Sequence, residues 1–194
     1  MPTGIALQDA RGLLFDAAER VLLHEGASAL TSRTVTTEAG VAKGVMHRHF
    51  ADFDTFLTEL VLDRAAQLDA HAAALRDAAG TGTVADNLTD TLIALFGPLA
   101  VAIVGLVISR DQLRARLRKA GAARIPLIAE GTAMIASYLT AERDVGRIAA
   151  DADIDTLAPT LIGAAHLRFA DRDSTPPDTA AVHKMVIMIM AGSA

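Results

Sequence analysis

The stretch GVAKGVMHRHF, residues 40–50, combines a glycine turn with a short helix that has one apolar and one cationic face. Its first glycine can take the left-handed conformation that ends one helix and turns the chain into the next. Because residues four apart share a helix face, Lys43 and His47 project together, as do Gly44 and Arg48. No acidic residue interrupts this face. The pattern is typical of a helix that lies in a DNA groove.

The apolar residues of the same stretch and the segment before it complete a motif. Val41, Met46 and Phe50 are expected to point toward a core. The preceding residues 31–39, TSRTVTTEA, begin with a threonine and a serine, either of which can cap a helix. Two short helices around a glycine turn make a helix-turn-helix.

Residues Asp9–Leu60 resemble the N-terminal domain of the TetR-type (tetracycline-repressor-like) transcriptional regulators. The matching features are an amphipathic first helix, RGLLFDAAERVLLHEGASALT, an arginine early in the second helix, and the run AGV-x-KG-x-x-x-x-HF. The family's usual run is close to AGVSKGTLYHHF, and a phosphate-contacting lysine is common at the start of its fourth helix. This chain departs from that pattern at Ala42, Val45, Met46, His47, Arg48 and Phe53.

The resemblance implies an all-α chain with two domains. A three-helix helix-turn-helix DNA-binding domain is expected at residues 1–52, and a helical ligand-binding and dimerisation domain at 53–194. Within the motif, a lysine can contact phosphate, an arginine can read guanine, and a valine can touch a thymine methyl group. A histidine can donate to a phosphate or a base edge. The expected DNA-binding residues are Arg33, Lys43, Gly44, Val45, His47 and Arg48.

The composition excludes several other classes of protein. The 194 residues carry a formal charge of −5 and include no cysteine, so neither disulfides nor thiolate sites can form and a cytoplasmic location is expected. Residues 1–50 hold five basic and five acidic side chains, so DNA binding must depend on local geometry. No secretory signal and no catalytic or nucleotide-binding motif occurs. We therefore expect no enzyme activity, no cofactor and no bound metal.

One apolar segment is long enough to be considered as a membrane-spanning helix. Thr91–Ser109 contains no charged residue over 19 positions, which is near the length that spans a bilayer. However, Gly97-Pro98 falls inside it, and proline removes a backbone hydrogen bond and disfavours helix in the residue before it. Two short buried helices are therefore favoured over one membrane span.

The spacing of apolar residues predicts helices to the end of the chain, without strands or repeats. Residues 110–124 hold six basic side chains against Asp111 alone, so they form either a solvated helix face or a second nucleic-acid patch. The solvated face is favoured because no aromatic residue or glycine turn accompanies the charges.

Two features near the C-terminus indicate where these helices begin and end. Asp151, Asp153 and Asp155 alternate as at the start of a calcium loop, but the required glycine and glutamate are missing, so a turn with helix capping is favoured. A further helix could begin at Asp155. Pro176-Pro177 is expected to interrupt the chain before a last helix over residues 180–190.

The effector site and the dimer interface are predicted from composition together with the resemblance. Family members commonly hold a small molecule between helices of the C-terminal domain, and an apolar pocket prefers an apolar ligand. The candidate ligand-pocket residues are Asn87, Thr91, Met134, Tyr138 and His166. The last two helices are unusually apolar for surface elements, which indicates a covering partner, and the family pairs them across a dimer. The candidate interface residues are Leu161, Ala165, Val182, Met185 and Ile189.

These observations predict a TetR-type regulator, a repressor, that binds a palindromic double-stranded DNA operator as a homodimer. A small apolar ligand would release it by shifting the dimer toward another spacing of its recognition helices. No membrane partner is expected. The alternative is a helical ligand-binding or membrane-associated protein whose helix-turn-helix is vestigial. An all-helical enzyme would need a convergent acid, base or nucleophile, and none is evident.

Overall fold

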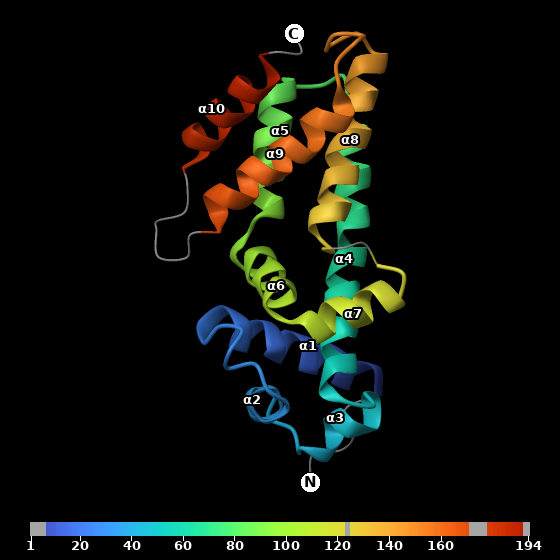
Figure 1. The fold of residues 1–194 in the computed structure, drawn as a ribbon, viewed down its shortest axis with the longest axis vertical. Coiled ribbons are helices and arrows are strands. Elements are labelled where there is room, and N and C mark those ends of the chain that lie inside the picture. Colours follow the sequence, from blue (N-terminus) through green and yellow to red (C-terminus); the bar gives the residue numbers. More distant parts are fainter. Residues whose placement is uncertain (1–6, 123–124, 171–177, 192–194) are drawn as a thin grey trace. The chain divides into compact units, whose positions relative to one another are not determined.

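The computed structural model describes residues 7–122, 125–170 and 178–191, and within them the chain forms ten helices and no strands (Figure 1). The predicted all-helical class is confirmed. Arg124, the last residue of the basic run, and the predicted interruption at Pro176-Pro177 lie outside the described residues. The helices are α1 Leu7–His24, α2 Ser32–Glu38, α3 Gly44–His49, α4 Phe53–Asp77, α5 Val84–Leu95, α6 Pro98–Ser109, α7 Asp111–Lys119, α8 Ile128–Asp144, α9 Ile154–Phe169 and α10 Thr179–Met190.

The chain divides into two compact units. The first comprises Met1–Asp63 and Ala102–Arg124, as far as they are described, and contains α1 to α3, the start of α4, most of α6 and all of α7. The second comprises Arg64–Val101 and Ile125–Ala194, again as far as described. A boundary between functional domains after residue 52 stays a prediction.

The first unit is built around three aromatic rings. Phe15 of α1, Phe50 at the end of α3 and Phe56 of α4 lie with ring centroids 5.0 to 5.8 Å apart. All three side chains are buried. The guanidinium of Arg11 lies 4.8 Å from the centre of the Phe50 ring and also pairs with Glu59 of α4. Packed rings and a cation over a ring together fix the end of α3 against α1 and α4.

The second unit is a helical layer structure in which α9 contacts both α8 and α10, and α10 also packs on α5 (Figure 1). Its core consists mainly of aliphatic side chains, together with Tyr138 and the ring of Phe96, on which the ring of Phe169 stacks at a centroid distance of 5.9 Å. Burial of this apolar surface is the main stabilising contribution.

The uncharged segment around Gly97-Pro98 is broken as predicted. The helices α5 and α6 meet at an angle of 62°. Pro98 is the first residue of α6, where its missing N–H costs no helical hydrogen bond. Within the described residues, no single helix has the length and apolar character needed to cross a membrane, although this bent pair meets the criterion jointly.

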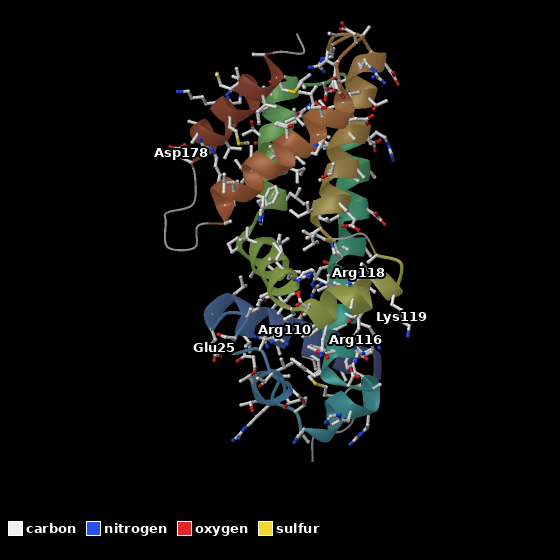
Figure 2. All side chains as sticks on the ribbon, viewed as in Figure 1. Glu25, Arg110, Arg116, Arg118, Lys119 and Asp178 are labelled. Carbon is white, nitrogen blue, oxygen red and sulfur yellow. The ribbon has the colours of Figure 1, made fainter. Side chains whose placement is uncertain are left out.

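The basic run at α7 is largely used within the first unit, as Figure 2 illustrates for Arg110 and Arg116. Arg110 donates to the carbonyl oxygens of Ala27 and Leu30, at 3.3 and 3.2 Å. Arg116 donates to Thr55 and to Asp52, at 3.0 and 2.8 Å. The predicted solvated face therefore holds for the exposed residues Arg118 and Lys119, whereas other arginines of the run reach into the protein.

Asp52 connects α7 with the start of α4. Its carboxylate accepts the Thr55 N–H at 2.6 Å and the Arg116 guanidinium at 2.8 Å. The hydrogen bonds from Thr55, followed by that from Arg116, lower the pKa of Asp52 from 3.8 to about 2. Because the folded pKa lies below the ordinary value, this stabilisation is complete above pH 3.8 and is lost as the pH falls through about 2.

We expect Asp52→Asn to lower the free energy of unfolding at pH 6, since the N-terminus of α4 loses a negative charge and the ion pair with Arg116 is lost. The difference from wild type should shrink as the pH falls from 4 to 2.5, where the wild-type carboxylate begins to protonate. Urea unfolding at several pH values measures both. Asp69→Asn, an exposed change on the same helix, is the control. A difference that stays constant with pH would contradict the assignment.

Asp153 is the N-cap of α9, and its carboxylate accepts the Thr156 N–H at 3.1 Å. The helix thus begins at Ile154, and the expectation that Asp155 leads it is corrected by one residue. The capping role expected for this aspartate-rich turn is confirmed, and hydrogen bonds from Thr156 lower the pKa of Asp153.

Candidate functional site

The helix-turn-helix forms as the sequence predicts. Thr31 is the N-cap of α2, with its hydroxyl accepting the Thr34 N–H at 3.2 Å while the Thr34 hydroxyl accepts the Thr31 N–H at 2.9 Å. Gly40 has a φ of +66°, the left-handed conformation that favours glycine. After it, Val41 N–H donates to the Thr36 carbonyl at 3.0 Å. This pattern ends α2 and directs the chain into α3.

Met46 is the residue that fixes α3 on the first unit, since its side chain is buried at 1% exposure and faces inward together with Phe50. Val41, predicted to be inward, is half-buried. The second helix is held against α1 by an ion pair in which Arg20 Nε lies 2.6 Å from Glu38 Oε1. The scaffold of the motif is therefore formed by side chains other than those on its outer face.

The outer face carries the six predicted DNA-binding residues. Arg33 on α2 is exposed, as are the N-cap residue Lys43 and, on α3, Gly44, His47 and Arg48, while Val45 is half-buried. The Lys43 side chain makes no capping hydrogen bond. Among the described residues, no carboxylate pairs with the three cations of this face. Their charges are thus available to an external anion.

The start of α4 differs from the pattern of the resembled family. Phe53 stacks on Phe56 with ring centroids 5.6 Å apart and an angle of 23° between the planes. A ring therefore packs at the position where the family commonly has a phosphate-contacting lysine. Any phosphate contacts of this motif must come from other residues.

The second unit contains a cavity of about 300 Å³ between α4, α5 and α8. Three of the five predicted ligand-pocket residues line it: Asn87, Thr91 and Met134. Most of the remaining wall is apolar. The described residues that line it are Leu68, His71, Ala74, Leu75, Ala78, Asn87, Asp90, Thr91, Ala94, Leu95 and Met134.

The other two predicted pocket residues lie elsewhere. Tyr138 is fully buried behind Asn87, whose side-chain amide donates to its hydroxyl at 2.9 Å. His166 of α9 packs against the Phe96 ring at 5.9 Å, and its buried Nδ1 has no hydrogen-bond partner among the described residues. Neither residue lines the cavity. The structure thus brings three of the predicted pocket residues together at the cavity and places the other two elsewhere.

Sequence reasoning missed the α4 wall of the cavity and Asp90. Leu68, His71, Leu75 and Ala78 recur at spacings of three and four and share one face of α4, which is a signal that the sequence contains. Nothing in that spacing says that α5 and α8 leave a cavity opposite this face.

A buried polar network lies behind the cavity. Glu142 has no exposed surface, and its carboxylate accepts the Tyr138 hydroxyl at 2.6 Å and lies 3.4 Å from the Arg147 guanidinium. Arg147 also donates to the carbonyl oxygens of Thr81 and Gly82, at 3.2 and 2.5 Å. Burial, and next the Glu142 carboxylate, raise the pKa of Tyr138 well above its ordinary value. The network joins the loop before α5 to α8.

The predicted interface residues divide by burial. Leu161, Ala165 and Val182 have no exposed surface because the second unit's own core covers them, whereas Met185 and Ile189 are half-buried. The large apolar side chains that α9 and α10 expose are Leu167 at 77%, Met188 at 69% and Ile187 at 46%.

Comparison with known proteins supports the resemblance stated for the motif. Residues 14–60 match the family model described as bacterial regulatory proteins, tetR family. No curated protein is significantly similar to the chain in sequence.

Solved structures share the fold over nearly the whole chain. The reduced form of Escherichia coli NemR has a TM-score of 0.75 at 15% identity, with 96% of this chain and 98% of that chain covered. A putative TetR-family transcriptional regulator from Mesorhizobium loti MAFF303099 has a TM-score of 0.73 at 17% identity, with 98% and 100% covered. The regulator FadR from Bacillus subtilis, solved with stearoyl-CoA, has a TM-score of 0.71 at 16% identity, with 93% and 98% covered.

The predicted resemblance to the TetR family is thereby confirmed: the N-terminal motif matches the TetR-family model, and the chain has the fold of TetR-family transcriptional regulators. At identities this low, the structural likeness concerns the fold and leaves ligand and operator open.

Proposed function

We propose that this chain is a TetR-type transcriptional repressor that binds a palindromic operator as a homodimer and is released by a small molecule. The observation that carries the proposal is the exposed, acid-free face that α3 presents after the Gly40 turn. Its cations have no intramolecular partner among the described residues, so an anion outside the protein can neutralise them. A DNA backbone offers such anions at regular spacing.

The residues of this face have distinct proposed roles. Lys43, which precedes the first turn of α3, contacts a phosphate, and Arg33 clamps the backbone from α2. Arg48 reads a guanine through two hydrogen bonds, and His47 donates to a phosphate or a base edge. Val45 meets a thymine methyl group. Gly44, without a side chain, lets the helix start approach the DNA closely.

The cavity of the second unit is the proposed effector site. Its wall is mainly aliphatic, which suits a ligand with an apolar body. Release requires that the ligand bind one spacing of the paired recognition helices more tightly than the other, because a ligand with equal affinity for both shifts nothing.

The proposed dimer interface uses the exposed apolar side chains of α9 and α10. Because Leu161, Ala165 and Val182 are already covered, we assign the contact to Leu167, Ile187 and Met188 together with the half-buried Met185 and Ile189. A charge placed in an apolar interface is costly when it is left without a partner.

We expect Met188→Glu to weaken the dimer by about tenfold or more, since it buries a carboxylate in the proposed interface. Sedimentation velocity across a concentration series measures the monomer–dimer equilibrium. Val145→Glu replaces an apolar side chain that is 58% exposed beyond the end of α8, and it should leave the equilibrium unchanged. Equal effects of both substitutions, or none from Met188→Glu, would remove this interface assignment.

A gel-shift assay with the DNA upstream of the chain's own gene tests the function. The proposal expects a shift that depends on DNA sequence and weakens as salt rises. A folded dimer that gives no such shift would instead favour a ligand-binding protein with a vestigial helix-turn-helix. The packed ring of Phe53 at the start of α4 is the observation that favours this alternative.

A further inference from the structure

The polar side chains that line the effector cavity have already used their hydrogen-bond donors within the protein. Both hydrogens of the Asn87 amide are taken, by the Thr81 carbonyl and the Tyr138 oxygen, each at 2.9 Å. A carbonyl oxygen only accepts, so the orientation of this amide is fixed. The Thr91 hydroxyl donates to the main-chain carbonyl oxygen of Asn87 at 2.7 Å. Neither side chain has a hydrogen left for a ligand.

His71 follows the same pattern. Its Nδ1 lies 3.2 Å from the carbonyl oxygen of Gln67, which can only accept, so Nδ1 carries the hydrogen. In the neutral ring, Nε2 is then an acceptor. The polar positions that remain around the cavity are therefore oxygen and nitrogen lone pairs.

Asp90 gives the cavity a negative charge. It is exposed and lines the cavity, and no cation among the described residues pairs with it. No lysine or arginine is among the described residues that line the cavity. An anionic ligand head would meet one carboxylate and no compensating charge there, whereas a cation would meet acceptors alone.

We infer that the effector is a protonated amine with a compact apolar body. The ammonium group donates to Asp90 and to the neighbouring acceptors, and the hydrocarbon part contacts Leu68, Leu75 and Met134. At about 300 Å³, the cavity is at the lower end of the range of roughly 300–1,000 Å³ for ligand sites, which suits a small ligand. This inference rests on the proposed function and narrows its ligand class.

The test compares three probes with the same chain length on the purified full-length protein: 1-octylamine, 1-octanol and octanoate. Isothermal titration calorimetry at pH 7 is expected to give the tightest binding for octylamine, weaker binding for octanol and the weakest for octanoate. Octanoate binding as tight as octylamine would overturn the inference, as would equal binding of octanol and octylamine.

Variants locate the bound amine. Asp90→Asn keeps the shape of the side chain and removes its charge, and it should weaken octylamine about three- to tenfold while leaving octanol unchanged. The matched control Asp69→Asn, exposed on α4 and outside the cavity lining, should change neither. Ala94→Leu fills the cavity from α5 and should weaken both probes. Octylamine binding that is insensitive to Asp90→Asn and Ala94→Leu would place the amine elsewhere and overturn the inference.

Gel shift separates this inference from the function on which it rests. Operator binding that is released by octylamine supports both. Operator binding that is released by octanoate or stearoyl-CoA, but not by the amine, keeps the regulator and removes the amine. The absence of sequence-dependent DNA binding removes the regulator, whatever the calorimetry shows.

Discussion

Replacing Lys43 and Arg48 together by alanine is expected to abolish the sequence-dependent gel shift while leaving the fold intact. Each bidentate base contact contributes about 1–3 kcal/mol of discrimination, and a dimer loses every contact twice. We therefore expect operator affinity to fall by at least about a hundredfold. Both side chains are exposed, so the free energy of unfolding should change by less than about 0.5 kcal/mol per substitution.

The two single variants should affect DNA binding in different ways. Lys43→Ala removes the proposed phosphate contact, so it should weaken binding to all DNA sequences alike. It should also reduce the slope of log K against log salt concentration by about 0.9 per lost contact. Arg48→Ala should instead relax specificity at one base pair of each half-site. Fluorescence anisotropy with operator and scrambled DNA, at several salt concentrations, distinguishes these results.

A matched control separates recognition from general charge attraction. Arg118 and Lys119 are exposed on α7 of the same unit, so the Arg118→Ala, Lys119→Ala double variant removes the same net charge without touching α3 (Figure 2). It should retain nearly full operator affinity. Equal losses in the two double variants would mean that α3 does not recognise DNA and that only long-range attraction was measured.

The helix-turn-helix was predictable from sequence because its determinants are local. A threonine cap, a glycine that takes a φ of +66° and an apolar residue at Met46 act within a few positions of one another. The outer face follows from helix geometry once the turn is placed. The stacking of Phe53 on Phe56 is equally local, since residues three apart on a helix are neighbours, so it too could be recognised from the sequence.

The proposed effector cavity was predictable only in part, because its lining depends on how three helices pack. Asn87 and Thr91 were recognisable as polar groups among apolar residues. His166 gave the same signal, yet it packs against Phe96. Asp90 gave no signal, because a charged side chain on an exposed helix face usually contacts only solvent.

For the apolar last helices too, the sequence alone could not show how the side chains pack. Their spacing predicts an apolar stripe but cannot say whether the chain's own core or a partner covers each residue. Leu161 and Val182 turned out to be covered within the second unit, whereas Met188 remains 69% exposed. The arginine run behaved similarly, since charge counting cannot reveal that Arg110 reaches the carbonyl oxygens of the loop after α1.

Glu142→Ala is expected to lower the free energy of unfolding by about 3 kcal/mol, at the lower end of the range for breaking a buried ion pair. The side chain has no exposed surface, and its removal leaves the Tyr138 hydroxyl without its acceptor and a cavity in its place. The expected loss is at the lower end because Arg147 can still donate hydrogen bonds to the carbonyl oxygens of Thr81 and Gly82.

Glu142→Gln separates the charge from the hydrogen bond. The glutamine side chain fills the same volume and can still accept the Tyr138 hydroxyl through its amide oxygen, so we expect a smaller loss of about 1–2 kcal/mol. Urea unfolding at fixed protein concentration measures both variants, since the apparent stability of the proposed dimer would depend on concentration. Glu25→Ala, which removes an exposed carboxylate after α1, should change stability by less than about 0.5 kcal/mol. If Glu142→Ala unfolds at the wild-type urea concentration, the network is dispensable for stability, and its role must then be sought in the position that Tyr138 gives to Asn87 at the cavity wall.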